Sequence, residues 1–157
     1  MAVEIERKFL VNVDLWNGSM KGVRRFYRQG YISTEPEKTI RVRLDDENAF
    51  ITIKGKASGM SRSEYEYRIP KQDAIEMLDQ FCSSIISKYR YMVPFGGKVW
   101  EVDEFLDENE GLIVAEIELS SEDEEFEKPL WVAEEVTGIE KYYNSNLSSH
   151  PFKQWTW

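Results

Sequence analysis

The sequence predicts a mainly β protein (α+β), a closed eight-stranded antiparallel β-barrel with a charged lumen and a few flanking helices. Two observations lead to this prediction. Charged and apolar residues alternate in one segment after another, and a β-strand sends alternate side chains to opposite faces of its sheet. Short polar or glycine-containing stretches separate these segments, which is typical of consecutive antiparallel strands.

The first half of the chain contains five expected strands. In the first, Glu4, Glu6 and Lys8 share one face, and mostly apolar residues occupy the other. The third and fourth flank a polar cluster that suits a hairpin loop, and the fifth ends before Pro70. The five expected strands are residues 3–11, 24–34, 39–45, 49–57 and 62–69.

In the second half of the chain, the spacing of apolar residues changes first from strand alternation to a helical period. Ala74, Ile75 and Leu78 follow helical spacing, which predicts a helix over residues 71–81. Glycine-containing turns then join three further strands, which makes eight in all. The three expected strands are residues 86–95, 98–105 and 112–119.

The last forty or so residues give weaker signals. The acidic stretch 120–128 predicts a solvated loop, and residues 131–138 predict a short helix that ends at Gly138. The aromatic C-terminal residues are expected to cover apolar surface. Among them, Trp155 and Trp157 are candidates for a homodimer contact.

The charged face of the predicted sheet leaves two architectures open. In a two-layer fold, helices cover the apolar face and the charged face meets water. If the sheet closes instead, the charged face lines a lumen, and eight strands leave room for side chains or one small ligand. An exposed face usually carries Thr, Ser and Gln among its charges. The positions here are nearly all ionic, which favours closure.

Composition predicts one soluble, acidic domain over residues 1–157. The chain is 41% hydrophobic and 31% charged, and its net charge is −9. The negative charge disfavours general nucleic-acid binding, which needs a basic surface. The chain lacks an apolar run near the ~18 residues of a membrane span and begins with charged residues, so we expect a cytoplasmic protein without a membrane partner.

Basic residues from several strands lie on the charged face, so only folding brings them together. A phosphate chain offsets their repulsion best, because arginine offers forked donors to phosphate oxygens and lysine a compact charge. At ~3.3 Å per residue, Glu4 and Lys8 are about 13 Å apart along their strand, which separates a metal end from a phosphate-binding end. A triphosphate suits this length. These basic residues are Lys8, Arg41, Arg43, Lys54, Lys88 and Arg90.

The acidic residues of the same face are hard oxygen ligands. His150 and Cys82 are the only histidine and cysteine in the chain, which argues against zinc, whereas Mg²⁺ or Mn²⁺ suits carboxylates and phosphate oxygens. Such an ion stabilises transition-state charge, and a nearby carboxylate can orient or deprotonate the attacking water. These acidic residues are Glu4, Glu6, Glu101, Asp103, Glu116 and Glu118.

Taken one at a time, these motifs also have plain structural explanations. An E-x-E-x-K strand is typical of a solvated face, and R-x-R or K-x-R pairs are typical of cross-strand salt bridges. Glu64 and Glu66 are expected to be partners of neighbouring basic residues. The combination, and not any single motif, indicates a binding site.

The order of the motifs resembles that of the CYTH family, the triphosphate tunnel metalloenzymes, which includes class IV adenylate cyclases and thiamine triphosphatases. The series runs E-x-E-x-K, R-x-R, K-G, E-x-E, K-x-R, W-E-x-D and A-E-x-E, from Glu4 to about Asn144. Further landmarks are QGYIS at 29–33, ITIKG at 51–55, EVTG at 135–138 and KYYN at 141–144.

The resemblance implies a closed tunnel that binds a triphosphate and cleaves it with Mg²⁺ or Mn²⁺. By that likeness the metal ligands are Glu4, Glu6, Glu116 and Glu118, with Asp103 at a second metal site. The residues that bind phosphate are Lys8, Arg41, Arg43, Lys54, Lys88, Arg90 and Lys141. The catalytic residues are Glu4, Glu6, Lys8 and Asp103.

The N-terminus departs from the cyclase pattern, which has a longer lead before E-x-E-x-K. The chain instead resembles short bacterial members whose implied activity is hydrolysis of inorganic triphosphate. Three alternatives stay open: a class IV adenylate cyclase, a hydrolase of thiamine or nucleoside triphosphates, and a non-catalytic polyphosphate-binding module. The structural alternative is an open sheet with a solvated charged face.

Overall fold

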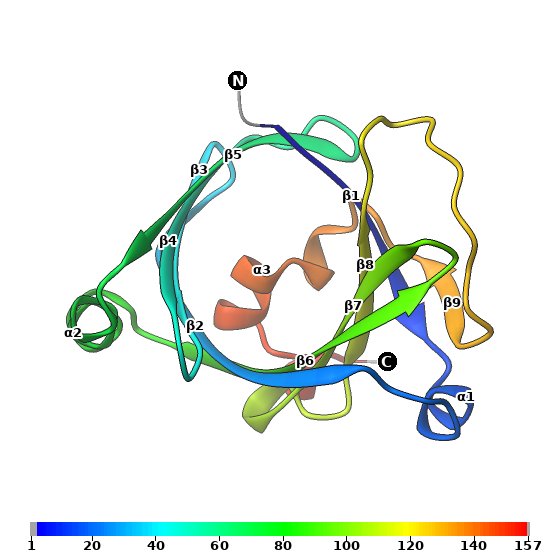
Figure 1. The fold of residues 1–157 in the computed structure, drawn as a ribbon. Helices are drawn as coiled ribbons and strands as arrows, with labels where there is room; N and C mark the ends of the chain where they lie inside the picture. Colours follow the sequence, from blue (N-terminus) through cyan, green and yellow to red (C-terminus); the bar gives the residue numbers. More distant parts are fainter. Residues whose placement is uncertain (1–2, 157) are drawn as a thin grey trace.

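Eight antiparallel strands close into a barrel in the computed structural model, which describes residues 3–156 (Figure 1). Around the barrel they follow the order β5-β4-β3-β2-β6-β7-β8-β1, and β1 pairs with β5 to close the ring. The predicted fold class is confirmed. The strands are β1 (Val3–Val11), β2 (Val23–Glu35), β3 (Lys38–Leu44), β4 (Ala49–Gly55), β5 (Ser61–Ile69), β6 (Ile85–Phe95), β7 (Lys98–Phe105) and β8 (Ile113–Glu118).

Strand β1 has two different neighbours along one of its edges. Residues 3–5 pair with β5, and the later part of the strand pairs with a ninth strand, β9 (Val132–Glu135). The helix predicted at 131–138 was therefore wrong. Beyond its contact with β5, β1 would expose unpaired backbone groups, and strand addition satisfies them. Arg7 and Glu135 also join β1 to β9 through hydrogen bonds of 2.9 and 2.6 Å.

The charged residues point into the lumen because of the strand alternation seen in the sequence. Residues directly opposite each other in an antiparallel pair share a face. Lys8 lies opposite Glu116 in this way, and Lys54 opposite Glu64. The intervening apolar residues point outward and need cover outside the barrel.

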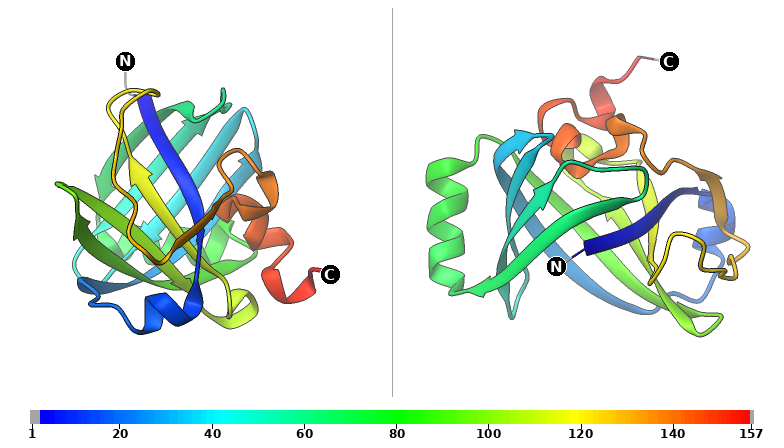
Figure 2. Two further views of the ribbon diagram at one scale, coloured as in Figure 1. Left: turned by 90° about the vertical axis from the view of Figure 1, so that its right-hand side faces the viewer. Right: turned by 90° about the horizontal axis from the view of Figure 1, so that it is seen from above.

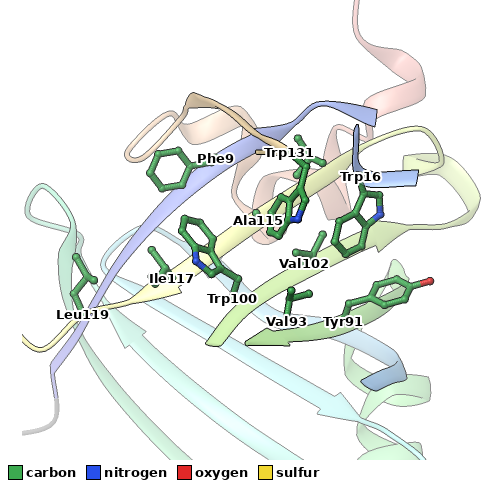
Figure 3. Close-up of a cluster of buried hydrophobic side chains, with 11 residues drawn as sticks. Phe9, Trp16, Tyr91, Val93, Trp100, Val102, Ala115, Ile117, Leu119 and Trp131 are labelled. Carbon is green, nitrogen blue, oxygen red and sulfur yellow. The ribbon is translucent and has the colours of Figure 1, made fainter. Parts of the chain in front are cut away.

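An aromatic cluster covers the outer face of β1, β6, β7 and β8 (Figure 3). Its largest members are Phe9, Trp16, Trp100 and Trp131. Trp16 comes from the short helix α1 (Val13–Asn17), and its indole N–H donates to Glu104 Oε2 at 2.6 Å. The cluster holds the strands that carry the acidic side of the lumen.

Helix α2 (Lys71–Phe81) covers the outer face of the barrel on the other side (Figure 1). It packs on β2, β3 and β4 through Ala74 and Leu78, so the predicted helix is confirmed. No helix within residues 3–156 is long and apolar enough to cross a membrane, and α2 itself has only 11 residues.

The C-terminal segment lies across one opening of the barrel. Figure 1 looks along the barrel and shows α3 (Asn144–Ser149) within the ring of strands, while Figure 2 shows it at one end. Two 3-10 turns flank this helix, η2 (Glu140–Tyr142) and η3 (Phe152–Gln154), and another, η1 (Asp107–Asn109), contacts η3.

The aromatic residues at the C-terminus cover apolar surface, as the sequence predicts. The Trp155 ring lies 5.3 Å from that of Tyr142 and 5.1 Å from that of Phe152, measured between centroids. These contacts lie within the chain. Trp157 lies outside the described residues, so a homodimer contact through this region stays a prediction.

Candidate active site

The lumen contains a cavity of about 200 Å³. The structure brings together at its wall eleven of the predicted site residues, which six strands contribute. They are Glu4, Glu6 and Lys8 on β1, Arg41 and Arg43 on β3, Lys54 on β4, Lys88 and Arg90 on β6, Glu101 on β7, and Glu116 and Glu118 on β8.

One side of the cavity is a group of carboxylates from two neighbouring strands, Glu4, Glu6, Glu116 and Glu118, which we call the acidic half. The register places Glu6 opposite Glu118, so their side chains share the lumen face. Two ammonium groups reach into this half. Lys54 Nζ lies 3.0 Å from Glu4 Oε1, and Lys8 Nζ lies 3.6 Å from Glu116 Oε1.

Burial and repulsion shift the pKa values of the acidic half. Burial raises the pKa of Glu6 well above its ordinary value, and the charges of Glu116 and Glu4 raise it further. Burial also opposes the ionisation of Glu116, but the charges of Lys8 and Arg90 outweigh it and lower the pKa of Glu116 to about 2. The pKa values of Glu6 and Glu116 therefore shift in opposite directions, and Glu6 is the carboxyl of the two that takes up a proton more readily.

Replacing Glu6 with glutamine is expected to raise the melting temperature of the protein in EDTA at pH 7 by several degrees. A carboxyl whose pKa is raised in the folded state loses stability as the pH rises from the unfolded pKa through the folded one. Glutamine does not undergo this loss. The advantage of Glu6→Gln should therefore vanish near pH 4, where Glu6 is protonated in both states.

Scanning calorimetry of both proteins at pH 4 and pH 7 measures this difference. Glu125→Gln, at an exposed position, is the matched control and should change the melting temperature little at either pH. An equal or lower melting temperature for Glu6→Gln at pH 7 would contradict the charge assignment.

The donor set of the acidic half fits a hard divalent cation. Such a cation would offset the repulsion between the carboxylates. Within residues 3–156, no three His, Cys, Asp or Glu side chains converge closely enough to hold an ion, and the ammonium groups of Lys8 and Lys54 supply positive charge there. Binding an ion would thus require Glu4 to exchange its contact with Lys54.

The other side of the cavity is a group of cations from β3 and β6, Arg41, Arg43, Lys88 and Arg90, which we call the basic half. Arg41 and Arg43 have buried Nε atoms with no hydrogen-bond partner among the described residues. Their contacts with Glu66 are long, at 3.5 and 3.9 Å. Burial and the charges of Arg41 and Arg90 lower the pKa of Arg43 to about 10. An anion in the cavity would accept hydrogen bonds from these guanidinium groups and offset the repulsion between them.

Asp103 lies behind the basic half and does not line the cavity. It is 1% exposed, and its oxygens accept hydrogen bonds from Lys88 Nζ at 2.8 Å and from Arg90 Nε and Nη2 at 2.7 and 2.8 Å. Burial opposes its ionisation, but the charges of Arg90 and Lys88 outweigh this and hold the pKa of Asp103 well below its ordinary value. With both oxygens engaged, its placement favours positioning of Lys88 and Arg90 over metal binding.

Burial also shifts the pKa of Lys88, which lies in the basic half. It lowers the pKa of Lys88 to about 7, although the carboxylate of Asp103 opposes the shift. Lys88 is 1% exposed, and its ammonium group makes a second hydrogen bond, to Asn144 Oδ1 at 3.1 Å. A phosphate oxygen nearby would favour the charged form.

Lys141 lies apart from the other basic residues predicted to bind phosphate. It is exposed on η2, with its ammonium group 4.6 Å from the ring centroid of Trp155 and 5.3 Å from that of Tyr142. It is not among the residues that line the cavity.

Several polar residues of the cavity wall were not predicted. Thr39 and Thr52 lie two residues from Arg41 and Lys54, so the same alternation identifies them. Arg62 lies opposite Glu4 and donates to the carbonyl of Gly55 at 2.9 Å. Tyr143, Asn144 and Ser145 come from the C-terminal segment, which has no alternation, and only the KYYN landmark marks the first two.

The fold and the lining together define a class of protein: a closed β-barrel that encloses a chamber for a small, highly charged anion beside a cation. The chain belongs to the CYTH family, because the CYTH domain model matches residues 2–149. This finding confirms the resemblance seen in the motifs. Metal dependence is general among CYTH triphosphatases.

Two relatives match nearly the whole chain. An inorganic triphosphatase of Acetivibrio thermocellus is 49% identical over 154 residues, which cover 98% of this chain and 97% of the relative. An inorganic triphosphatase of Nitrosomonas europaea is 35% identical over 150 residues, with 92% and 96% covered. A crystal structure of an inorganic triphosphatase superposes with a TM-score of 0.63 at 30% identity, covering 92% of this chain and 97% of the other.

Proposed function

We propose that this protein, one CYTH-like domain over residues 1–157, hydrolyses inorganic tripolyphosphate with a divalent metal. One observation carries the proposal: Arg41 and Arg43, whose buried Nε donors lack partners among the described residues, line a cavity together with the acidic half. Unsatisfied charged donors favour a compact anion that is rich in oxygen. The two relatives named inorganic triphosphatase support the choice of substrate.

The cations of the lumen bind phosphate oxygens in this proposal. Lys8 lies at the border of the two halves, 3.6 Å from Glu116 and 3.4 Å from the carbonyl oxygen of Tyr142. Lys54 contacts Glu4 and Glu64 at 3.0 and 3.4 Å. Both lysines exchange a carboxylate for a phosphate oxygen when substrate enters. The full set is Lys8, Arg41, Arg43, Lys54, Lys88 and Arg90, and Lys141 is omitted because of its position.

The acidic half would hold the metal. Mg²⁺ and Mn²⁺ prefer carboxylate, water and phosphate oxygens, and the crowded carboxylates supply the first of these. When bound, such an ion neutralises phosphate charge and makes the terminal phosphorus easier to attack. The ligands we propose are Glu4, Glu6, Glu116 and Glu118.

The reaction needs positioning and charge stabilisation more than covalent chemistry. A water oxygen bonds to the terminal phosphorus, and the bond from that phosphorus to the bridging oxygen breaks, giving orthophosphate and pyrophosphate. Arg41, Arg43 and Arg90 stabilise the charge that develops on the pyrophosphate. Glu4 or Glu6 orients the water and accepts its proton.

A substrate panel with Mg²⁺ and with Mn²⁺ tests the proposal. We expect kcat/KM for tripolyphosphate to exceed that for ATP and thiamine triphosphate by at least about tenfold, because the lining offers charge contacts but few groups for an organic moiety. EDTA should abolish phosphate release.

Three outcomes of this panel would contradict the proposal. Cyclic AMP formation from ATP would indicate a class IV adenylate cyclase. Faster turnover of ATP or thiamine triphosphate would indicate another triphosphatase. Tight binding of tripolyphosphate without turnover would indicate a non-catalytic polyphosphate-binding module.

The partners, cellular location and oligomeric state of the enzyme are also part of the proposal. With a net charge of −9, we expect no nucleic-acid or membrane partner and a cytoplasmic location. Homodimer formation through the C-terminal aromatic residues is a further expectation. Sedimentation velocity measures the oligomeric state, and a monomer at micromolar concentration would contradict it.

A further inference from the structure

Asn144 connects the C-terminal segment to the lumen. It is the first residue of α3 and lines the cavity. Its side-chain Oδ1 accepts hydrogen bonds from Lys88 Nζ and from Gln29 Nε2, both at 3.1 Å. Gln29 is 0% exposed and Lys88 is almost as deeply buried, so two buried donors from β2 and β6 hold this amide.

The ammonium group of Lys88 determines which way the amide of Asn144 points. An ammonium group only donates, so the Asn144 atom beside it is the oxygen. Gln29 then has to turn its Nε2 toward that oxygen, and its own Oε1 is left buried without a partner among the described residues. Turning the Asn144 amide would place its N–H groups against those of Lys88 and Gln29, and turning the Gln29 amide would place its oxygen against the oxygen of Asn144.

This orientation leaves the amide nitrogen of Asn144 for the cavity. Oδ1 and Nδ2 lie on opposite sides of a planar amide, so Nδ2 points away from Lys88 and Gln29. The hydrogen bonds found within residues 3–156 use Asn144 Oδ1 but not Nδ2. Asn144 therefore presents two N–H donors, without a charge, next to the buried ammonium group of Lys88.

The neighbouring residues bring the same segment against a second lysine of the lumen. Lys8 Nζ donates to the carbonyl oxygen of Tyr142 at 3.4 Å and lies 5.5 Å from the ring centroid of Tyr143. Ser145 also lines the cavity. The segment thus lies at the end of the cavity that contains Lys8 and Lys88.

We infer that Asn144 is a substrate-binding residue whose Nδ2 donates a hydrogen bond to an unsubstituted terminal phosphoryl group at the closed end of the lumen. The inference rests on the proposed function and specifies which end of the triphosphate is recognised. A substituent on the phosphate chain has to point toward the other opening. The amide adds a directional contact without adding to the repulsion among the cations.

Replacing Asn144 with aspartate separates this role from a structural one. The carboxylate keeps an acceptor for Lys88 and Gln29, but it replaces the donor with a negative charge that faces the phosphate. We expect KM for tripolyphosphate to rise by about 30-fold or more, since a donor to a charged group becomes a like charge. The melting temperature without substrate should stay close to that of the wild type.

Two further variants complete the experiment. Asn144→Thr carries a hydroxyl, one bond nearer the backbone, in place of the amide and so lacks the two N–H donors, and it should raise KM by about tenfold without any added charge. Gln154→Glu, exposed on η3, adds the same net charge as Asn144→Asp outside the cavity and should leave KM unchanged. If Asn144→Asp does not fold, Asn144→Thr decides the question.

The outcomes distinguish this inference from the proposed function. If the wild type hydrolyses tripolyphosphate and Asn144→Asp has an unchanged KM, Asn144 only positions Lys88 and the inference is overturned. If the wild type does not hydrolyse it, the proposed function fails, and isothermal titration with tripolyphosphate then tests the contact alone. A Kd for Asn144→Asp that is at least tenfold weaker supports the contact, and an equal Kd overturns it.

Discussion

Replacing Asp103 with asparagine is expected to lower the free energy of unfolding by about 3–5 kcal/mol, as is typical when one partner of a buried ion pair is removed. The change is isosteric, so it leaves no cavity. It does leave Lys88 without its carboxylate, and it sets an amide N–H against the donors of Arg90. Urea denaturation in EDTA and without substrate measures the loss.

An exposed aspartate provides the control for this change. Asp79 lies on the exposed face of α2, and Asp79→Asn should change the free energy of unfolding by less than about 0.5 kcal/mol. A loss for Asp103→Asn as small as that of the control would contradict the buried network. It would also reopen a role for Asp103 as a metal ligand.

Replacing Glu116 with glutamine is expected to lower kcat/KM for tripolyphosphate by about a thousandfold, or ~4 kcal/mol of transition-state stabilisation. Glu116 is the carboxylate of the acidic half whose pKa is lowered to about 2, so it is charged at neutral pH and ready to bind a cation. Its loss also removes the ion-pair partner of Lys8. Steady-state phosphate release at several Mn²⁺ concentrations measures the effect.

The metal dependence of this variant shows whether Glu116 acts through the ion. We expect Glu116→Gln to need more Mn²⁺ for half-maximal activity, whereas Glu125→Gln, at an exposed position, should match the wild type. Activity within about tenfold of the wild type, with an unchanged Mn²⁺ requirement, would exclude Glu116 from the metal site.

The alternation within single strands predicted most of the fold and eleven lumen residues. The two-residue period of a strand places Glu4, Glu6 and Lys8 on one face without any knowledge of the neighbouring strands. Closure of the barrel is harder to predict, because it depends on which edge of β1 pairs with β5. β9 was missed for the same reason: residues 132–135 form a strand only because β1 has a free edge beside them.

Asp103 does not line the cavity, and the register between neighbouring strands explains why. The alternation within one strand carries no information about register. Glu101 and Asp103 are two residues apart and share a face. Their partners on β6 differ, since Asp103 lies opposite Arg90 and Glu101 lies opposite Met92. Asn144 was missed because a helical residue at the end of a barrel has no period that relates it to the strands.

A crystal structure with Mn²⁺ and an imido-bridged, non-hydrolysable tripolyphosphate analogue tests the central claim most directly. The anomalous signal of manganese locates the ion independently of the analogue. We predict manganese bound by carboxylates of the acidic half, and analogue oxygens within hydrogen-bond distance of Arg41, Arg43 and Lys88. Manganese bound away from the acidic half, or the analogue bound outside the lumen, would contradict the account.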